Sequence, residues 1–211
     1  MSKDLIIVAG FLGAGKTTLL RNLIKAHSEK KLAVLINDFG EVPVDATLVA
    51  SETDGSVTVS EITGGSIFCS CRQDSFLKAL MRLADMDVDM IVVEASGNSD
   101  PTLIAKLLAQ SGLSAKLVLK HTLCLFDPVK SYKLSHVLAV IPHQVAAADV
   151  VLLTKSDITT QEDRARARGY VRALNDDAPI LEICRGMADF AGLPLRRPDR
   201  GIEESGFQPA V

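Results

Sequence analysis

Residues 10–17 read GFLGAGKT, which matches the phosphate-binding pattern GxxxxGKT. The stretch follows an apolar run at residues 5–9 and precedes a helical pattern, as expected of a strand, loop and helix that cradle phosphates. In such a loop the glycines let main-chain N–H groups converge on phosphate oxygens, and the helix amino terminus adds positive potential. We therefore expect the following residues to bind a nucleotide: Gly10, Gly13, Ala14, Gly15, Lys16, Thr17 and Thr18.

Two residues of this loop carry further chemistry. Lys16 is a candidate catalytic residue, because its ammonium group can neutralise charge on the β- and γ-phosphates. The Thr17 hydroxyl is a candidate ligand of Mg²⁺. ATPases of the partitioning type carry an extra lysine near the start of the loop, and Phe11 occupies that place here. The loop therefore favours another class of nucleotide-binding protein.

Strand-like and helical patterns alternate along the rest of the chain. This alternation predicts a three-layer α/β fold, with a mainly parallel β-sheet and helices on both faces. Asp74 and Thr160 are the expected helix N-caps, and Pro101 fits a first helical turn. The expected strands are Leu5–Ala9, Leu32–Ile36, Val57–Glu61, Met90–Glu94, Leu117–Phe126, Val150–Thr154 and Ile180–Ile183, and the expected helices are Thr17–His27, Asp74–Met86, Thr102–Gln110, Ser131–Ala148 and Gln161–Leu174.

Length and composition indicate one folded domain. The chain has 211 residues, of which 47% are hydrophobic and 23% charged. We expect a domain over residues 1–186 and an extended or disordered extension over residues 187–211, where Gly, Pro and Arg become frequent. The formal net charge of −3 argues against nucleic acid and anionic membranes as partners. Four cysteines do not make a disulfide scaffold, and no run approaches the ~20 apolar residues of a membrane span, so we expect a cytoplasmic protein.

A second motif, Thr154-Lys155-Ser156-Asp157, follows a late strand of the predicted sheet. It is similar to the NKxD motif of GTPases, with Thr in place of Asn. The Asp157 carboxylate can accept hydrogen bonds from guanine N1–H and N2–H₂, a pair of donors that adenine lacks, and Lys155 can lie over the base. Cys184 and Arg185 follow the last predicted strand, where a base-contacting loop commonly lies. The motif favours GTP or GDP as the nucleotide.

Acidic groups stand at or just after the ends of three other predicted strands. Glu94 and Gly97 follow the run 90–93, where Glu94 can hold the water shell of Mg²⁺ and the Gly97 N–H can reach a γ-phosphate. Asp38 follows the second strand and is a candidate ligand of Mg²⁺ or a water-positioning group. Asp127 and Pro128 follow the fifth strand and are expected to close a turn.

Five segments together carry a family resemblance. The sequence resembles the CobW-like GTPases, the group that includes the UreG, HypB and MeaB accessory proteins. This resemblance implies a P-loop G domain, slow GTP hydrolysis, a nucleotide-dependent homodimer, and delivery of a metal or cofactor to a client metalloenzyme or corrinoid protein. Larger members of the family carry a second domain, and from the length of this chain we expect a G domain standing alone. The segments are GFLGAGKTT at 10–18, NDFGEVPVD at 37–45, EITGG at 61–65, EASGNSDP at 94–101 and QVAAADVVLLTKSD at 144–157.

The metal motif of that family is altered in this chain. CobW-like proteins typically continue GG with CxCC, whereas Ser66 and Phe68 replace the first two of those cysteines here. Cys69 keeps the third, and Cys71 is added two residues later. In extended backbone the two sulfurs of this CxC can point to one side, but two thiolates do not complete a tetrahedral site unless a dimer supplies four. Transition-metal binding (Zn²⁺, Co²⁺ or Ni²⁺), inert buried thiols and a redox switch all stay open.

Three functional hypotheses follow. The leading one is a GTP-dependent metallochaperone or cofactor-loading protein. The second is a GTP-gated protein chaperone that binds no metal itself, which the missing cysteines favour. The third is a P-loop small-molecule kinase, which the Asp157 motif disfavours. Because no residue resembles a positioned catalytic glutamine, we expect slow intrinsic hydrolysis, with the missing group supplied by the dimer or the client.

Overall fold

The computed structural model describes residues 2–38, 57–63, 70–190 and 192–193, and only the backbone of residues 37–38, 57–63 and 70–72. Seven strands form one sheet in the order β3-β2-β4-β1-β5-β6-β7, and every pairing between neighbours is parallel. The mainly parallel sheet expected from the alternating pattern is therefore confirmed. The strands are β1 (Lys3–Gly10), β2 (Leu32–Asp38), β3 (Val57–Thr63), β4 (Met90–Glu94), β5 (Leu117–Phe126), β6 (Val150–Leu153) and β7 (Ile180–Glu182).

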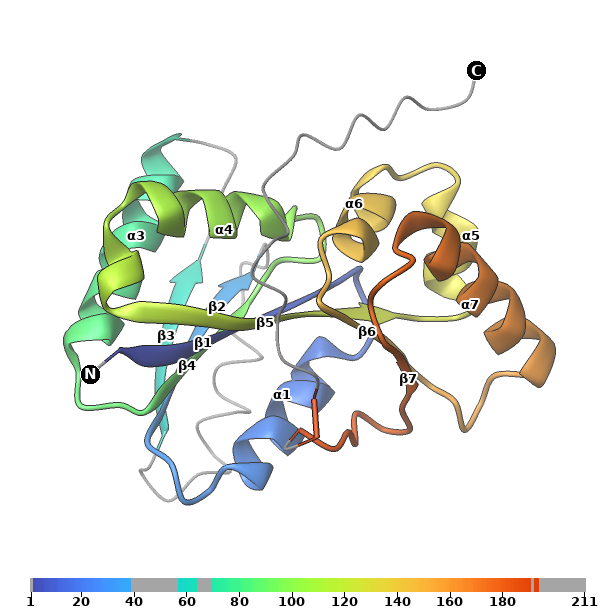
Figure 1. Ribbon diagram of the computed structural model, residues 1–211, viewed down its shortest axis with the longest axis horizontal. Coiled ribbons are helices and arrows are strands. Elements are labelled where there is room, and N and C mark those ends of the chain that lie inside the picture. The colour runs from blue at the N-terminus through green and yellow to red at the C-terminus, as the bar shows by residue number, and fades with distance from the viewer. Residues whose placement is uncertain (1, 39–56, 64–69, 191, 194–211) are drawn as a thin grey trace.

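Helices cover both faces of this sheet (Figure 1). One face packs against α1, and the opposite face packs against the other long helices, which gives the predicted three layers. The helices are α1 (Lys16–Ala26), α3 (Ser70–Asp85), α4 (Pro101–Gln110), α5 (Lys130–Ser135), α6 (Val140–Ala146) and α7 (Gln161–Leu174), with a short 3₁₀ turn, η1 (Leu113–Ala115).

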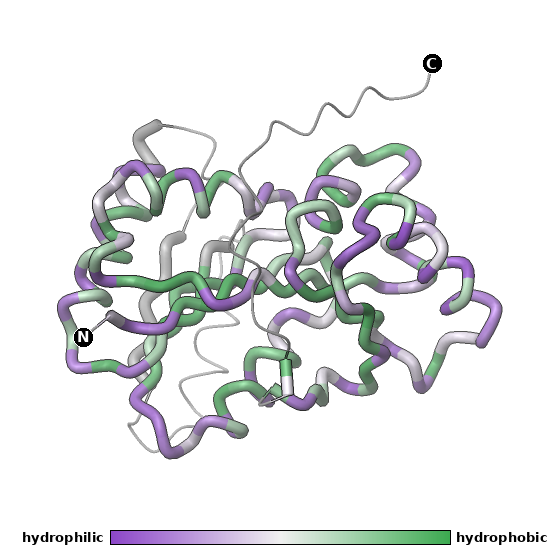
Figure 2. The backbone as a smooth tube through the Cα atoms, in the orientation of Figure 1, coloured by the Kyte–Doolittle hydropathy of each residue, from purple (hydrophilic) through white to green (hydrophobic). Residues whose placement is uncertain are grey.

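Successive residues of the central strand β1 serve opposite faces of the sheet. Ile6 and Val8 pack with α1, whereas Leu5 and Ile7 pack with α3 and α4. A strand covered on both faces reads as a continuous apolar run, because every side chain enters a core. Figure 2 shows this as hydrophobic colour along the central strands and hydrophilic colour along the outer surfaces of the helices.

The region expected to form one helix over 131–148 forms two. Here α5 ends at Ser135, a turn follows, and α6 begins at Val140. Pro142 explains the break, because proline inside a helix lacks the N–H for the bond to residue 138 and clashes with that carbonyl, whereas a first turn tolerates it. The single-helix expectation was wrong, although the signal was present in the sequence.

Of the two expected N-caps, Thr160 is confirmed and Asp74 is wrong, and the expected place of Pro101 in a first helical turn is confirmed. Thr160 caps α7 in a reciprocal capping box with Asp163, and Pro101 lies in the first turn of α4 behind the N-cap Asp100. Asp74 is not an N-cap, because α3 begins at Ser70. No glycine or proline interrupts residues 70–73, so the helix extends one turn further than its apolar stripe requires.

The chain after β7 returns to the α1 face. Phe190 is partly buried and Leu193 is buried, and both pack against the core beside α1. The domain boundary at residue 186 stays a prediction, and these contacts show that residues 187–193 touch the domain. The rest of the expected extension, residues 194–211, lies outside the described residues.

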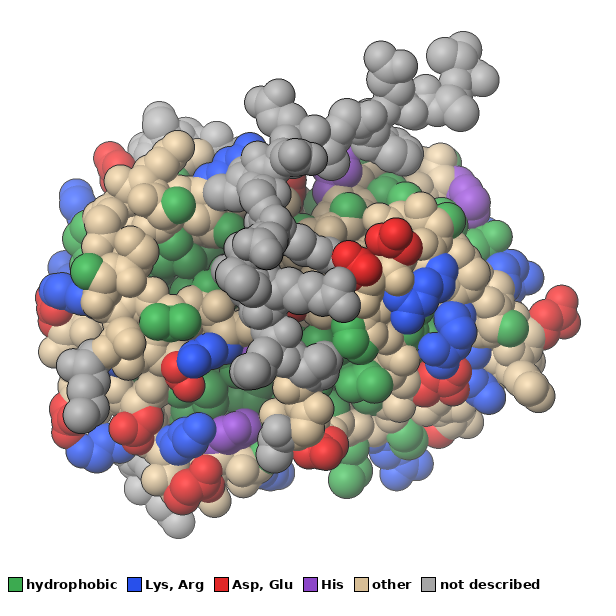
Figure 3. Space-filling model, in the orientation of Figure 1, with side chains coloured by type: hydrophobic (Ala, Val, Ile, Leu, Met, Phe, Trp, Pro, Cys, Tyr) green, Lys and Arg blue, Asp and Glu red, His purple; other side chains and the backbone are tan. Residues whose placement is uncertain are grey.

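The surface of α7 carries arginines that are paired with acid. Arg164 and Arg168 contact the Glu182 carboxylate at 3.1 and 2.8 Å. Figure 3 shows basic and acidic side chains interspersed on this face of the molecule. In the described part of the chain, no helix combines the length and apolar character needed to cross a bilayer.

Candidate nucleotide site

The phosphate-binding loop joins the end of β1 to the start of α1. Three glycines of the loop, Gly10, Gly13 and Gly15, have φ values of +142°, +77° and +101°. Residues that carry a side chain rarely adopt such values. At Gly10 a Cβ atom would also lie only 2.6 Å from the main-chain oxygen of Leu125. The glycines of the motif are therefore required by the backbone path of the loop itself.

Lys16 is held across this loop. Its Nζ donates a hydrogen bond to the main-chain oxygen of Gly10 at 3.0 Å, and the side chain is buried. The bond places the ammonium group beside the amino end of α1, where main-chain N–H groups also gather. Positive charge thus collects at the point where the motif predicts phosphate.

A cavity of about 420 Å³ opens in front of the loop. It brings together three segments that are far apart in sequence: the loop and first turn of α1, the end of β4 with the residues after it, and Lys155. The lining residues are Leu12, Gly13, Gly15, Lys16, Thr17, Thr18, Glu94, Ala95, Ser96, Gly97 and Lys155.

The end of β4 supplies the acidic side of this cavity. Glu94 is the last residue of the strand and is buried, in register with Val8 of β1 and Ile36 of β2. Gly97 lies against the phosphate-binding loop so closely that a Cβ atom would stand 2.9 Å from the Leu12 nitrogen. A glycine at position 97 therefore allows the segment after β4 to line the cavity.

The Thr154-Lys155 segment continues from β6 at the same edge of the sheet. Lys155 has a φ of +59°, and its Nζ pairs with the Asp127 carboxylate at 2.7 Å. Asp127 is buried, and its carboxylate also accepts hydrogen bonds from the main-chain nitrogens of Val129 and Lys130. Burial acts to raise the pKa of Asp127, but these hydrogen bonds and the Lys155 charge outweigh it and lower the pKa. Asp127 is therefore an anion that holds Lys155 in place.

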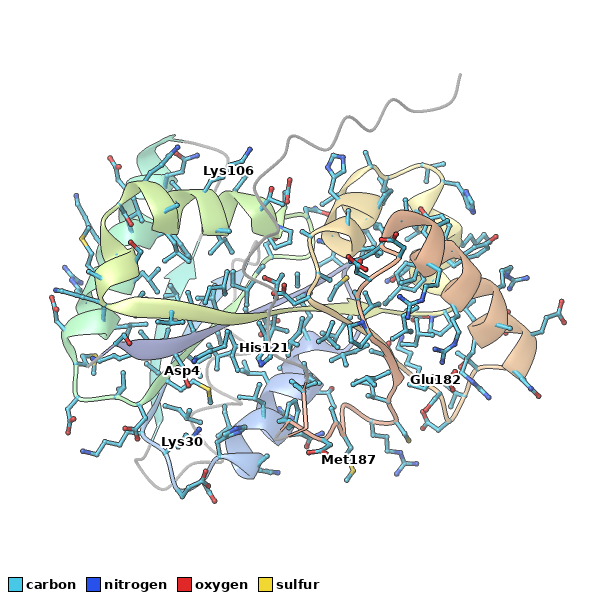
Figure 4. The ribbon with its side chains drawn as sticks, viewed as in Figure 1. Asp4, Lys30, Lys106, His121, Glu182 and Met187 are labelled. Carbon is cyan, nitrogen blue, oxygen red and sulfur yellow. The ribbon has the colours of Figure 1, made fainter. Side chains whose placement is uncertain are left out.

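The remaining residues predicted to contact a base lie on two adjacent loops. Arg185 Nε approaches the Asp157 carboxylate at 3.5 Å, and the Ser156 nitrogen donates to the Ile183 oxygen at 3.2 Å. Cys184 is partly buried in the same loop, which runs between the labelled residues Glu182 and Met187 in Figure 4. The structure thus brings Asp157, Cys184 and Arg185 together, outside the phosphate cavity. Gly10, Ala14 and Thr154, also predicted to bind the nucleotide, do not line that cavity, and Ala14 and Thr154 are buried.

For three predicted metal ligands, the structure describes the backbone at most. Asp38 is the last residue of β2, and Cys71 lies in the first turn of α3, but their side chains are outside the described residues, as is all of Cys69. The extended backbone considered for the CxC does not hold at Cys71, because α3 begins one residue earlier. Within the described ranges, no group of three His, Cys, Asp or Glu side chains is placed to hold a metal ion.

Two residues, Asp127 and Gln144, have larger structural roles than the sequence predicts. Asp127 was expected only to close a turn, and Gln144 was part of a quoted motif without any role. Gln144 is 1% exposed and donates from Nε2 to the main-chain oxygens of Gly97 and Ser99, each at 3.0 Å. The only available signal was position: Asp127 directly follows a strand, at the sheet edge where ligands bind.

His121 does not belong to this site. It lies on β5 opposite Ile6 of β1, near Asp4, and therefore closer to the amino ends of the strands (Figure 4). Burial lowers the pKa of His121, against the opposing effect of Asp149. Burial among the strands therefore disfavours the charged form of this imidazole.

A glycine-rich loop between a strand and a helix, facing an acidic strand end across one cavity, defines a P-loop nucleotide-binding protein. The family model described as the CobW/HypB/UreG nucleotide-binding domain matches residues 4–182. The chain belongs to this family, as its motifs indicated.

Individual relatives agree with this assignment. The zinc chaperone YjiA of Escherichia coli (strain K12) is 32% identical over 191 residues, which cover 87% of this chain and 58% of YjiA. The crystal structure of Zn(II)-bound YjiA GTPase from E. coli matches with a TM-score of 0.65 at 24% identity, over 90% of this chain and 60% of that one. HypB from Helicobacter pylori in complex with nickel matches with a TM-score of 0.62 at 18% identity, over 88% and 80%. The two structures show a shared fold, and the chain spans less than two thirds of YjiA.

Proposed function

We propose that this protein is a GTP-binding, slowly hydrolysing accessory protein that supplies a transition metal to a client metalloprotein. The observation that carries the proposal is the joining of two motifs at one edge of the sheet. Lys155 of the guanine-type motif lines the same cavity as Lys16 and Thr17 of the phosphate-binding loop. A nucleotide with its phosphates at the loop therefore extends its base toward Asp157.

The proposed roles follow the chemistry of each segment. Main-chain N–H groups of residues 13–18 and the Lys16 ammonium hold the phosphates. Asp157 accepts from guanine, Lys155 covers the base, and the loop of Cys184 and Arg185 borders it. The N–H of Gly97 meets the γ-phosphate. When GTP is hydrolysed to GDP and phosphate, loss of the γ-phosphate releases the loop after β4.

The residues present also fit Mg²⁺. Thr17 and Glu94 line one cavity and offer a hydroxyl and a carboxylate, the oxygen ligands that Mg²⁺ prefers. Asp38, at the end of the neighbouring strand β2, is the third proposed ligand. When bound, Mg²⁺ would neutralise charge that develops on the β- and γ-phosphates. The proposed catalytic residues are therefore Lys16, which neutralises the same charge, and Asp38 and Glu94, which would hold Mg²⁺.

The metal cargo is proposed from the relatives and from the sequence. YjiA and YeiR of E. coli are named zinc chaperones, and Cys69 and Cys71 stand where the family carries its metal motif. Because one chain offers only two of these thiolates, a nucleotide-dependent homodimer would be needed to supply four. A corrinoid protein as client and a cytoplasmic location remain predictions.

Metal content in each nucleotide state tests this function. Reduced protein, prepared anaerobically with Mg²⁺ and either GDP or a non-hydrolysable GTP analogue, is incubated with Zn²⁺, Co²⁺ or Ni²⁺, beside Cys69→Ser/Cys71→Ser. We expect stoichiometric metal that depends on both thiols and changes with the nucleotide. Guanine-nucleotide binding without thiol-dependent metal would contradict the metal-carrying role.

A second candidate is a GTP-gated chaperone that binds no metal itself. Ser66 and Phe68 in place of two family cysteines favour it. It predicts nucleotide-dependent binding of a client with no metal on this chain. A small-molecule kinase is the least favoured alternative, and phosphoryl transfer to an acceptor without guanine preference would support it.

A further inference from the structure

The loop after β4 is clamped between two other parts of the chain. On one side, Gly97 touches the phosphate-binding loop at Leu12. On the other side, the Gln144 amide of α6 donates both of its N–H groups to the loop, one to the Gly97 oxygen and one to the Ser99 oxygen. The loop therefore reaches the phosphate cavity while α6 holds it from behind.

The orientation of the Gln144 amide follows from its partners. Both acceptors are main-chain oxygens, so the nitrogen must face them and Oε1 must point away. Gln144 Oε1 is buried and has no hydrogen-bond partner among the described residues, and the same is true of Ser99 Oγ. A buried polar atom without a partner costs free energy, so this arrangement needs a compensating gain.

Apart from its packing against Leu12, the segment 96–99 makes few other hydrogen bonds within the described residues. Its own bonds are a turn from the Ser99 nitrogen to the Ser96 oxygen and a long bond from the Asn98 nitrogen to Ser96 Oγ. Gln144 is thus its principal hydrogen-bonded attachment to a helix within the described residues.

We infer that Gln144 is a positioning residue that holds the Gly97 N–H at the phosphate cavity and thereby sets the preference for a nucleoside triphosphate over a diphosphate. This inference rests on the proposed function, in which Gly97 meets the γ-phosphate. Gln144 touches no nucleotide itself. Its two hydrogen bonds hold the loop in the conformation that a γ-phosphate requires, and a diphosphate does not use that conformation. The same bonds couple the γ-phosphate to α6, because a ligand that fixes the loop also fixes the helix bonded to it.

The test compares the nucleotide preference of wild type with that of Gln144→Met, which keeps the length of the side chain and removes both donors. Titration calorimetry with Mg²⁺ measures the dissociation constants of a non-hydrolysable GTP analogue and of GDP. We expect the preference for the analogue to fall about tenfold in the variant. The affinity for GDP should stay within about twofold of wild type.

A matched control lies at the same carboxyl end of α6, but its hydrogen bonds go to that end of the helix and not to the loop after β4. Asn175 is also a buried amide whose Nδ2 donates to two main-chain oxygens, those of Val145 and Ala148, at 2.8 and 3.0 Å. Asn175→Leu should lower stability as Gln144→Met does but leave the nucleotide preference unchanged. Hydrogen exchange should increase at residues 97–99 in Gln144→Met only.

Gln144→Glu provides a second variant if the methionine variant folds poorly. Its carboxyl group donates one hydrogen bond, and only when protonated, so its preference for the triphosphate analogue should recover in part as the pH falls. A folded Gln144→Met or Gln144→Glu protein that keeps the wild-type preference at neutral pH would overturn the inference alone. Failure of wild type to bind either guanine nucleotide would overturn the proposed function and this inference together.

Discussion

The two ends of the candidate nucleotide site are built in different ways. At the phosphate end, three glycines with positive φ and the amino end of α1 shape the main chain, and Lys16 bonds to the loop itself. At the base end, side chains pair with each other across loops, as Lys155 does with Asp127 and Asp157 with Arg185. The phosphate end is therefore a property of one continuous segment, whereas the base end depends on contacts between segments.

This difference predicts a separation of effects. Changes at the phosphate end should weaken all nucleotides alike, because phosphates carry no information about the base. Changes at the base end should alter which nucleotide is chosen. Three variants follow, in order of decreasing expected effect. Gly10→Ala and Asp127→Asn test how each end is built, through stability, and Lys16→Ala tests the separation in nucleotide binding.

Gly10→Ala should have the largest effect. The φ of +142° and the close approach to the Leu125 oxygen leave no room for a methyl group, so we expect a loss of about 3 kcal/mol in the free energy of unfolding. Urea denaturation measures it. Gly112→Ala is the control, because Gly112 has a φ of +72° and no heavy atom within 4 Å of the added carbon. There we expect about 1 kcal/mol, and equal losses at the two sites would contradict the steric argument.

Lys16→Ala should weaken guanine and adenine triphosphates alike. Loss of a charge-assisted contact to phosphate predicts about 100-fold weaker binding for each, with the ratio between the two unchanged. Fluorescent-nucleotide displacement measures both affinities. Lys25→Ala, at the other end of α1, should change neither affinity. A shift in the guanine-to-adenine ratio in Lys16→Ala would break the proposed separation.

Asp127→Asn should have a smaller effect, and one that depends on pH. The carboxylate has a lowered pKa in the folded protein, so its stabilising contribution is present above the unfolded-state pKa of about 3.9 and is lost as the pH falls through the folded value. We expect the free energy of unfolding of the variant to be lower by about 1.5 kcal/mol at neutral pH and to approach that of wild type in acid. The loss is modest because Lys155 is partly exposed to solvent.

Chemical denaturation at several pH values measures the Asp127 effect. Asp85→Asn removes an exposed partner of Lys116 and serves as the control, with no measurable loss expected. A stability difference between wild type and Asp127→Asn that grows as the pH falls would show that Asp127 is not the stabilising anion described above.

The same comparison explains what could be predicted from sequence. The phosphate-binding loop was found because its residues are contiguous and each glycine has a local backbone reason. Asp127 and Lys155 are 28 positions apart, and Gln144 and Gly97 are 47 apart, so no local pattern reveals that they touch. The apolar runs of the chain predict the parallel sheet, whereas the apolar spacing of residues 131–148 favours one helix and only Pro142 indicates the break before α6.

Selectivity between guanine and adenine nucleotides tests the central claim most directly. Titration calorimetry with Mg²⁺ compares non-hydrolysable GTP and ATP analogues on wild type and on Asp157→Asn. We expect wild type to prefer the guanine nucleotide by about 10⁴, and the variant to lose most of that preference while its weak binding of the ATP analogue is unchanged. Equal affinity of wild type for the two analogues, or a preference that survives in Asp157→Asn, would contradict the account.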